Sequence, residues 1–350
     1  MNRIQYIDLM RILACLMVLF AHTGEFYYIT PTGGVVENFT DFVNIYGSLF
    51  RIPVPLFVVI SGYLLLPIKE NQFVFYKKRF GRIISPFLVW SFVYVLVSFL
   101  KNEYTSSQAF ERAASIFVNF NWNSGHLWFI YMLIGLYLFI PVISPWVISA
   151  SKSQKEFFLF IWAITLFFPY VRTEIPNLLG ESFWNEFSTT YYFSGFIGYL
   201  LLENYLKENF TVNLKRDIWL GFTCISLGYV ITFLVFQNQI TFAKTLAVLE
   251  LSWRFNTINI ALMVFGFFII ARHFQISSVF ISKLLTDISA FTYGIYIIHI
   301  LVLGETFKIL NQITQDPPLL IILNGIFTFS ICYIILKLIS LLPRSKYITG

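Results

Sequence analysis

Long apolar runs separated by short polar stretches follow one another along the whole chain. Ten runs lie at 12–29, 49–68, 83–100, 127–148, 157–171, 187–202, 218–236, 255–271, 288–310 and 319–342. A helix needs about 17 or more residues to cross a hydrocarbon layer ~30 Å thick, and the fifth and sixth runs are shorter than that. The pattern predicts an all-α integral membrane protein with about ten transmembrane helices in one bundle.

Basic side chains are distributed unevenly between the two sets of loops. If all ten runs cross, 17 of the 24 Lys and Arg residues lie with the termini and the even-numbered loops, and 7 lie in the odd-numbered loops. Cytoplasmic loops carry an excess of Lys and Arg. We therefore expect both termini, and the basic residues of the segment 77–82, to lie in the cytoplasm.

Composition agrees with a membrane setting. A soluble domain carries about 25% charged residues, whereas this chain has 12% charged and 57% hydrophobic residues. The net charge of +6 lies mainly in short loops, so we expect membrane lipid and no nucleic acid as a partner. Cys15, Cys224 and Cys332 each fall in a different run, which predicts neither a disulfide framework nor a metal site. We expect one membrane-embedded domain over residues 1–350.

Arg11 and His22 are the most informative residues of the first run. Eleven steps of 100° make about three turns, so both side chains project from one helix face, ~16 Å apart along the axis. An ionisable group at mid-depth in a membrane is costly, and function is its default explanation. Glu25, three residues after His22, can orient the imidazole. The alternatives are a topological anchor for Arg11 and a packing role for His22.

Further polar candidates lie in other runs. His299 is expected near mid-depth with Tyr293 close by, and Ser61 precedes a glycine that allows close backbone approach. His126 and Trp128 are expected at the outer interface, where they could contact a sugar. Packing between helices and an aromatic belt are the structural alternatives for these residues.

The segment 77–82 has its own candidate chemistry. Arg79 and Arg82 are three residues apart on the expected first turn of the third helix, and Lys78 is adjacent. Guanidinium groups present forked donors suited to phosphates, so a polyphosphorylated cytosolic ligand would bind there. Fixing of topology and contact with anionic lipid are the alternatives.

Five stretches in fixed order resemble one family over residues 4 to about 340. They are the Arg11-x10-His22 pair after Ile7-Asp8, followed by VPLFVVISGYL, YKKRFGRIISP, HLWFIYMLIGLYLFIPVI and TYGIYIIH. Together they resemble the acyltransferase-3 family of bacterial multi-pass membrane O-acyltransferases. Many cell-wall members carry an extracytoplasmic esterase-like domain, which we do not expect here.

The resemblance implies transfer of an acyl group, expected to be acetyl, from cytosolic acyl-CoA to an extracytoplasmic or lipid-linked glycan. It implies a bacterial inner-membrane enzyme with acetyl-CoA or another acyl-CoA as donor substrate and no permanently bound cofactor. A homo-oligomer is left open. His22 and Glu25 are then the expected catalytic residues. The expected acyl-CoA site comprises Arg11, Lys78, Arg79 and Arg82. The expected acceptor or oxyanion site comprises Ser61, His126, Trp128, Tyr293 and His299.

Two other functions fit a chain of this kind. A transporter or flippase that exports a glycolipid or polysaccharide also uses many spans and buried ionisable residues. A polysaccharide polymerase is a third reading. A flippase needs a wide polar path, whereas the polar residues here follow one narrow line, which favours the acyltransferase.

Overall fold

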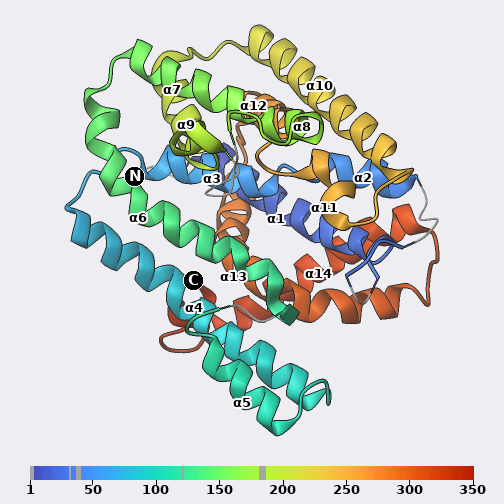
Figure 1. Ribbon diagram of the computed structural model, residues 1–350. Helices are drawn as coiled ribbons and strands as arrows, with labels where there is room; N and C mark the ends of the chain where they lie inside the picture. Colours follow the sequence, from blue (N-terminus) through green and yellow to red (C-terminus); the bar gives the residue numbers. More distant parts are fainter. Residues whose placement is uncertain (1–3, 31–32, 37–40, 120–121, 181–186) are drawn as a thin grey trace. The chain divides into compact units, whose positions relative to one another are not determined.

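The structure is a computed structural model that describes residues 4–30, 33–36, 41–119, 122–180 and 187–350. Every extended regular element among these residues is a helix (Figure 1). The longest are α1 (Gln5–Glu25), α4 (Gln72–Leu100), α6 (Trp128–Ser149), α10 (Leu214–Ile240), α13 (Val279–Leu310) and α14 (Pro317–Ile339). Shorter helices are α2 (Phe42–Leu49), α3 (Pro53–Leu65), α5 (Ser106–Ser115), α7 (Lys152–Thr165), α8 (Phe168–Glu174), α9 (Ile197–Asn209), α11 (Leu246–Leu249), α12 (Ile258–Ala271) and α15 (Lys346–Thr349). Three 3-10 turns are η1 (Trp122–Leu127), η2 (Ser188–Phe193) and η3 (Leu251–Trp253).

Nine helices or consecutive helix pairs in the described residues are long and apolar enough to cross a membrane. They span residues 5–25, 42–65, 72–100, 124–149, 152–174, 214–240, 251–271, 279–310 and 317–339. The prediction of an all-α multi-pass membrane protein is thereby confirmed.

The sixth expected run, 187–202, differs from the other nine. It contains η2, a break and the start of α9, which has 13 residues. At 1.5 Å per residue α9 is only ~20 Å long, less than a hydrocarbon layer of ~30 Å. The break follows from extended backbone at Ser194 and a φ of +76° at Gly195. The expected count of about ten therefore becomes nine long helices among the described residues.

The chain divides into two compact units, each built from two segments far apart in sequence. The first unit comprises residues 1–66 and 145–286, and the second comprises residues 67–144 and 287–350.

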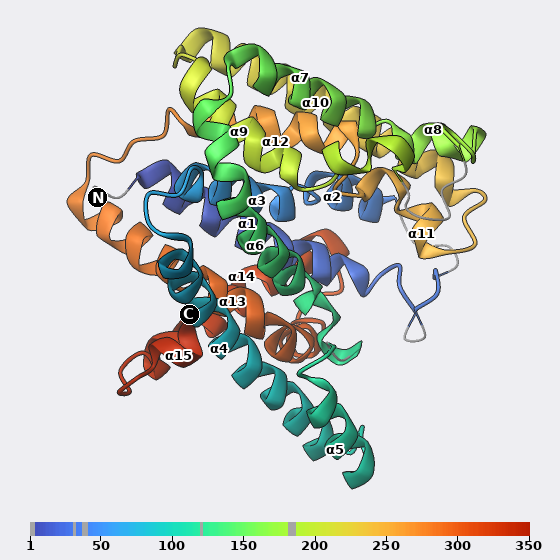
Figure 2. The same cartoon turned by 60° about the vertical axis from the view of Figure 1, so that its left-hand side comes forward.

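In the first unit, α10 and α12 lie along each other, as both ribbon views show (Figures 1 and 2). A Cβ atom added to Gly266 would lie 2.4 Å from the carbonyl oxygen of Gly221. The helix α9 approaches α3 in the same way, since a Cβ atom at Gly62 would lie 2.7 Å from the carbonyl oxygen of Leu200. Small residues let these backbones approach closely where lipid supplies no hydrophobic driving force.

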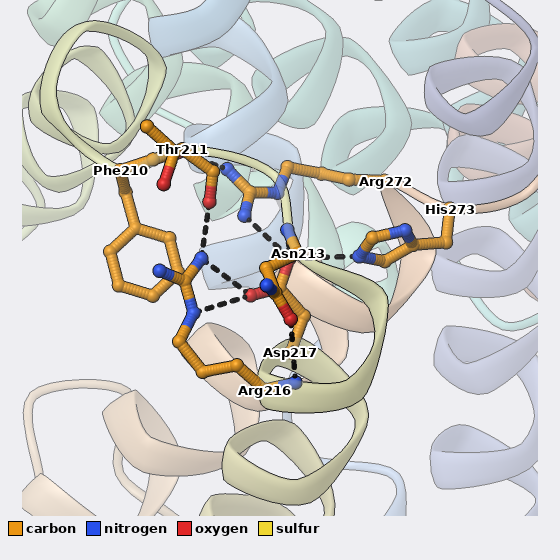
Figure 3. Close-up of polar contacts among 7 residues, drawn as sticks. All are labelled: Phe210, Thr211, Asn213, Arg216, Asp217, Arg272 and His273. Carbon is orange, nitrogen blue, oxygen red and sulfur yellow. Dashed lines mark hydrogen bonds and ion pairs between the residues drawn. The ribbon is translucent and has the colours of Figure 1, made fainter.

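A buried carboxylate joins the start of α10 to the end of α12 (Figure 3). Asp217 is fully buried and accepts hydrogen bonds from Arg216 Nη2 at 2.7 Å and Arg272 Nη2 at 3.0 Å. His273 Nε2 lies 2.8 Å from the same carboxylate. The Arg216 guanidinium also lies 3.9 Å from the centroid of the Phe210 ring, which follows α9. One carboxylate thus ties three helices together.

In the second unit, α15 packs against α4 (Figure 2). Trp90 Nε1 donates to the carbonyl oxygen of Ile348 at 2.9 Å, and Ser85 Oγ donates to that of Tyr347 at 2.9 Å. The helices α13 and α14 are joined by a 2.7 Å hydrogen bond between the hydroxyl groups of Thr306 and Thr328. Short polar contacts between helices therefore recur in both units.

We expect Asp217→Asn to lower the free energy of unfolding by about 3 kcal/mol, because it leaves the buried Arg272 without its counter-charge. The measurement is unfolding of the purified protein in mixed micelles with increasing SDS. Asp316→Asn is the matched control, since Asp316 is exposed before α14 and surface changes stay within about 0.5 kcal/mol. Equal stability of the two variants would contradict the structural role of Asp217.

Candidate active site

His22 and Glu25 lie on the last turn of α1. His22 Nδ1 is 2.9 Å from Glu25 Oε2, and the two side chains are 24% and 31% exposed. The spacing of three residues places both on one helix face. When the Nδ1 proton is donated to the carboxylate, the lone pair lies on Nε2, which is the arrangement of a histidine base oriented by an acid.

Arg11 lies near the opposite end of α1 from His22. Arg11 Nη1 is 3.7 Å from Asp8 Oδ1, and Asp8 is buried. The eleven steps from Arg11 to His22 correspond to about 16 Å along the helix. Arg11 therefore contributes to the electrostatics of its own end of α1, where its contact with Asp8 orients it.

The structure adds Arg51, which the sequence analysis did not single out. It lies in the break between α2 and α3, where Pro53 and Pro55 cannot donate backbone hydrogen bonds. Arg51 Nη2 donates to the Tyr28 hydroxyl at 2.9 Å and lies 3.9 Å from Glu250 Oε1. An arginine two residues before a Pro-x-Pro pair inside an apolar run is the signal that could have identified it.

Tyr28 and Glu250 complete this group. The Tyr28 hydroxyl donates to Glu250 Oε1 at 2.5 Å across 222 residues of sequence. Burial raises the pKa of the Tyr28 hydroxyl well above its ordinary value of 10.0, so this side chain stays protonated and neutral. The Arg51 guanidinium also interacts electrostatically with Glu25. Arg51 and Glu250 are thus two charged side chains that both contact Tyr28, three residues after Glu25.

In the second unit, His126 and His299 face each other. Their ring centroids are 4.9 Å apart, and both side chains are buried. His126 Nε2 lies 3.0 Å from the carbonyl oxygen of Ile297 and 3.3 Å from the Tyr94 hydroxyl. His126 was expected at the outer membrane interface, where it could contact a sugar, and that position stays a prediction. The 3-10 turn η1 directs its side chain against α13.

The other acceptor candidates make local contacts. Ser61 Oγ donates to the carbonyl oxygen of Phe57 at 2.9 Å within α3. The Tyr293 hydroxyl donates to the carbonyl oxygen of Ile83 at 2.7 Å and thereby joins α13 to α4. Trp128 is half-buried at the start of α6. Ser61 belongs to the first unit, whereas Tyr293 and Trp128 belong to the second.

The basic segment forms the first half of α4. Asn71 caps this helix, because its side chain accepts from the backbone N–H of Phe73. Lys78 pairs with Glu70, whereas Arg82 is exposed. The Arg79 guanidinium lies 5.6 Å from the centroid of the Phe75 ring, and its Nε has no hydrogen-bond partner among the described residues. Arg79 and Arg82 are therefore the members of this segment best placed to bind an added anion.

No group of three or more His, Cys, Asp or Glu side chains in the described part of the chain could hold a metal ion.

Comparison with known proteins gives a family. A model described as an acyltransferase domain of the acyltransferase-3 type matches residues 4–337. No curated protein matches the chain, and no solved structure matches it. The matched region contains α1, the basic start of α4 and the helices that carry His126 and His299. The chain belongs to the acyltransferase-3 family of membrane acyltransferases.

Proposed function

We propose that this protein transfers an acyl group, acetyl in the simplest case, from cytosolic acyl-CoA to a hydroxyl of an extracytoplasmic or lipid-linked glycan. The observation that carries the proposal is the contact of His22 Nδ1 with Glu25 Oε2 at 2.9 Å, on an apolar helix. Within the family we propose a role like that of the O-acetyltransferase of enterobacterial common antigen. The proposed location is the inner membrane of a bacterium.

The reaction needs a base because a sugar hydroxyl attacks a thioester poorly while it keeps its proton. His22 takes that proton as the hydroxyl oxygen forms a bond to the thioester carbonyl carbon. The carbon–sulfur bond then breaks, and the CoA thiolate leaves and receives the proton from the imidazolium. Glu25 stabilises the imidazolium while it exists, as a carboxylate does in other histidine bases.

For the donor we propose that Arg79 and Arg82 bind the CoA phosphates, with Arg11 and Lys78 adding positive charge. The exposure of Arg82 and the unpartnered Nε of Arg79 support this assignment. Arg11 and Lys78 have less support as members of the acyl-CoA site, since Arg11 contacts Asp8 and Lys78 contacts Glu70.

For the acceptor or the oxyanion we propose a contribution from His126 and His299. Their ring contact and their tyrosine neighbours supply several hydrogen-bonding groups in one buried place. Trp128 offers an aromatic face of the kind that stacks on a sugar. Ser61 and Tyr293 are proposed with less support, because both hydroxyls already donate to backbone carbonyl groups.

His22→Ala should lower acyl transfer by at least about 10²-fold, the usual contribution of a general base. Glu25→Gln should lower it by about tenfold, since the imidazolium loses its counter-charge. The assay follows radiolabelled acetyl groups from acetyl-CoA into membrane glycolipid with purified protein in nanodiscs.

Glu111→Gln on α5 is the matched control, because Glu111 is exposed, and it should keep full activity. More than a tenth of normal activity in His22→Ala would contradict the role of the histidine. Glycolipid transport without any acyl transfer would support the flippase instead.

Arg79→Gln and Arg82→Gln should each weaken binding of a non-reactive acyl-CoA thioether by about tenfold, as expected for loss of a charge-assisted hydrogen bond. Lysine should restore part of the affinity, because it keeps the charge but loses the fork. Calorimetric titration gives the Kd, and Arg112→Gln, an exposed arginine on α5, is the control. Unchanged affinity for the acyl-CoA thioether in both variants would indicate that these arginines only fix the topology.

Acyl-CoA should react only from the membrane face that bears residues 77–82. The uneven distribution of Lys and Arg predicts that this face is cytoplasmic. Sealed vesicles of the two orientations, supplied with external acyl-CoA, measure the sidedness. Detergent should make both preparations equally active. Equal rates before detergent would show that the predicted division between donor and acceptor faces is wrong.

A further inference from the structure

The segment 340–350, which follows α14 and is called the arm below, folds back onto α4. Ser85 Oγ donates to the carbonyl oxygen of Tyr347 at 2.9 Å. Trp90 Nε1 donates to the carbonyl oxygen of Ile348, also at 2.9 Å. The helix α15 of the arm therefore lies beside α4 (Figure 2). Both the arm and α4 belong to the second unit.

The arm also packs closely against α13. A Cβ atom added to Gly294 would lie 2.8 Å from the carbonyl oxygen of Thr349, so a side chain at this position of α13 would displace the arm. Thr349 is buried. Ser345 Oγ donates to the carbonyl oxygen of Ser340 at 3.2 Å, within the turn between α14 and α15. Contacts with two helices and within its own turn thus fix the position of the arm in the second unit.

This position brings two cations of the arm to the basic start of α4. Ser85 lies three residues after Arg82, which is about 5 Å along the helix. Tyr347 directly follows Lys346 and lies three residues after Arg344. The hydrogen bond between Ser85 and Tyr347 therefore places the backbone of Lys346 near that of Arg82. The side chains of Arg82, Arg344 and Lys346 are all exposed.

The acids of the second unit do not neutralise these cations. Glu70 pairs with Lys78, and Asp287 pairs with Lys337 at 2.5 Å. The remaining acids of this unit lie at or beyond the opposite ends of α4, α13 and α14: Glu103, Glu111, Glu305 and Asp316. In the described part of the second unit, six basic residues of the α4 start and the arm have no acidic partner: Lys69, Lys77, Arg79, Arg82, Arg344 and Lys346. Cations gathered in this way attract an anion.

Arg344 has a backbone conformation that its residue type disfavours. Its φ is +63°, in the left-handed region that glycine adopts without steric cost. Because the side chain is exposed, packing does not explain an arginine at this position. Backbone strain of this kind recurs at ligand-binding sites. The positive charge is the property that a glycine at this position would not supply.

We propose that the arm forms the second side of the acyl-CoA site, where Arg344 and Lys346 bind the phosphate groups of CoA together with Arg79 and Arg82. This inference rests on the proposed function, in which the two arginines of α4 bind the donor. CoA carries a diphosphate and a further phosphate on its ribose, so cations from two segments can bind separate phosphate groups. Anionic lipid headgroups present the same phosphate chemistry and are the competing source.

The test is the affinity for the non-reactive acyl-CoA thioether, measured by calorimetric titration in nanodiscs of phosphatidylcholine, which has no net charge. Arg344→Gln and Lys346→Gln should each raise the Kd by about fivefold, as expected for loss of one exposed charge pair. The double variant should raise it by about 25-fold if the two contacts are independent. Lys308→Gln is the matched control, because Lys308 is 70% exposed near the opposite end of α13, and it should leave the Kd unchanged.

Two further variants separate binding from folding. Arg344→Gly should lose affinity as Arg344→Gln does but unfold at no lower SDS concentration, because glycine adopts the observed φ freely. Trp90→Phe removes the donor to Ile348 and should raise the Kd by about threefold, since the arm is held less firmly. Unfolding of Arg344→Gly at lower SDS concentration would assign Arg344 a structural role and overturn the proposal.

A change of lipid distinguishes the two sources of phosphate. An arm that binds lipid headgroups would retain phosphatidylglycerol, detected by native mass spectrometry, and lose it in the double variant of Arg344 and Lys346. That result, with an unchanged Kd for the thioether, would overturn the proposal in favour of lipid. An unchanged Kd in the arm variants alongside weaker binding in Arg79→Gln would overturn the role of the arm and leave the proposed function intact. An unmodified protein that binds no thioether would overturn both.

Discussion

A charge among apolar helices must meet an opposite charge, because an unpaired ion there costs several kcal/mol. The first unit obeys this constraint near both ends of α10. Asp217, at the start of α10, is surrounded by two guanidinium groups and an imidazole. Near the other end, Phe236 supports Trp253, on which Arg51 rests beside its carboxylate. The contacts that neutralise charge are also those that join the helices.

The parts of the candidate site that follow from the sequence are local ones. His22 and Glu25 lie three residues apart on one helix, so the helical period alone predicts their contact. The group around Arg51 is different. Tyr28 and Glu250 are 222 residues apart, and a single sequence contains no information on which distant side chains meet. Only the arginine before Pro53 gives a local signal, and a topological role would explain that equally well.

The fold likewise has features that follow from the sequence and features that do not. Of the ten runs expected from apolar length, nine correspond to long helices among the described residues, because hydropathy reports which segments a membrane can accept. Hydropathy does not report where the backbone turns. The positive φ of Gly195 interrupts the sixth run, so this run does not form one continuous helix. Likewise, His126 beside Trp128 is a pair of residue types typical of the aromatic belt at a membrane interface. Its burial against His299 depends on the direction of a 3-10 turn, which no periodicity encodes.

The discontinuous first unit has a consequence for biosynthesis. Residues 1–66 are made first, but their partners in 145–286 follow only after the intervening segment of the second unit. At about 5–20 residues per second, the 222 residues between Tyr28 and Glu250 take roughly 10–40 s to translate. For most of that interval the nascent chain holds Arg51 without Glu250. The segments that form α1, α2 and α3 are therefore synthesised well before the carboxylate of Glu250, with which Arg51 pairs in the folded protein.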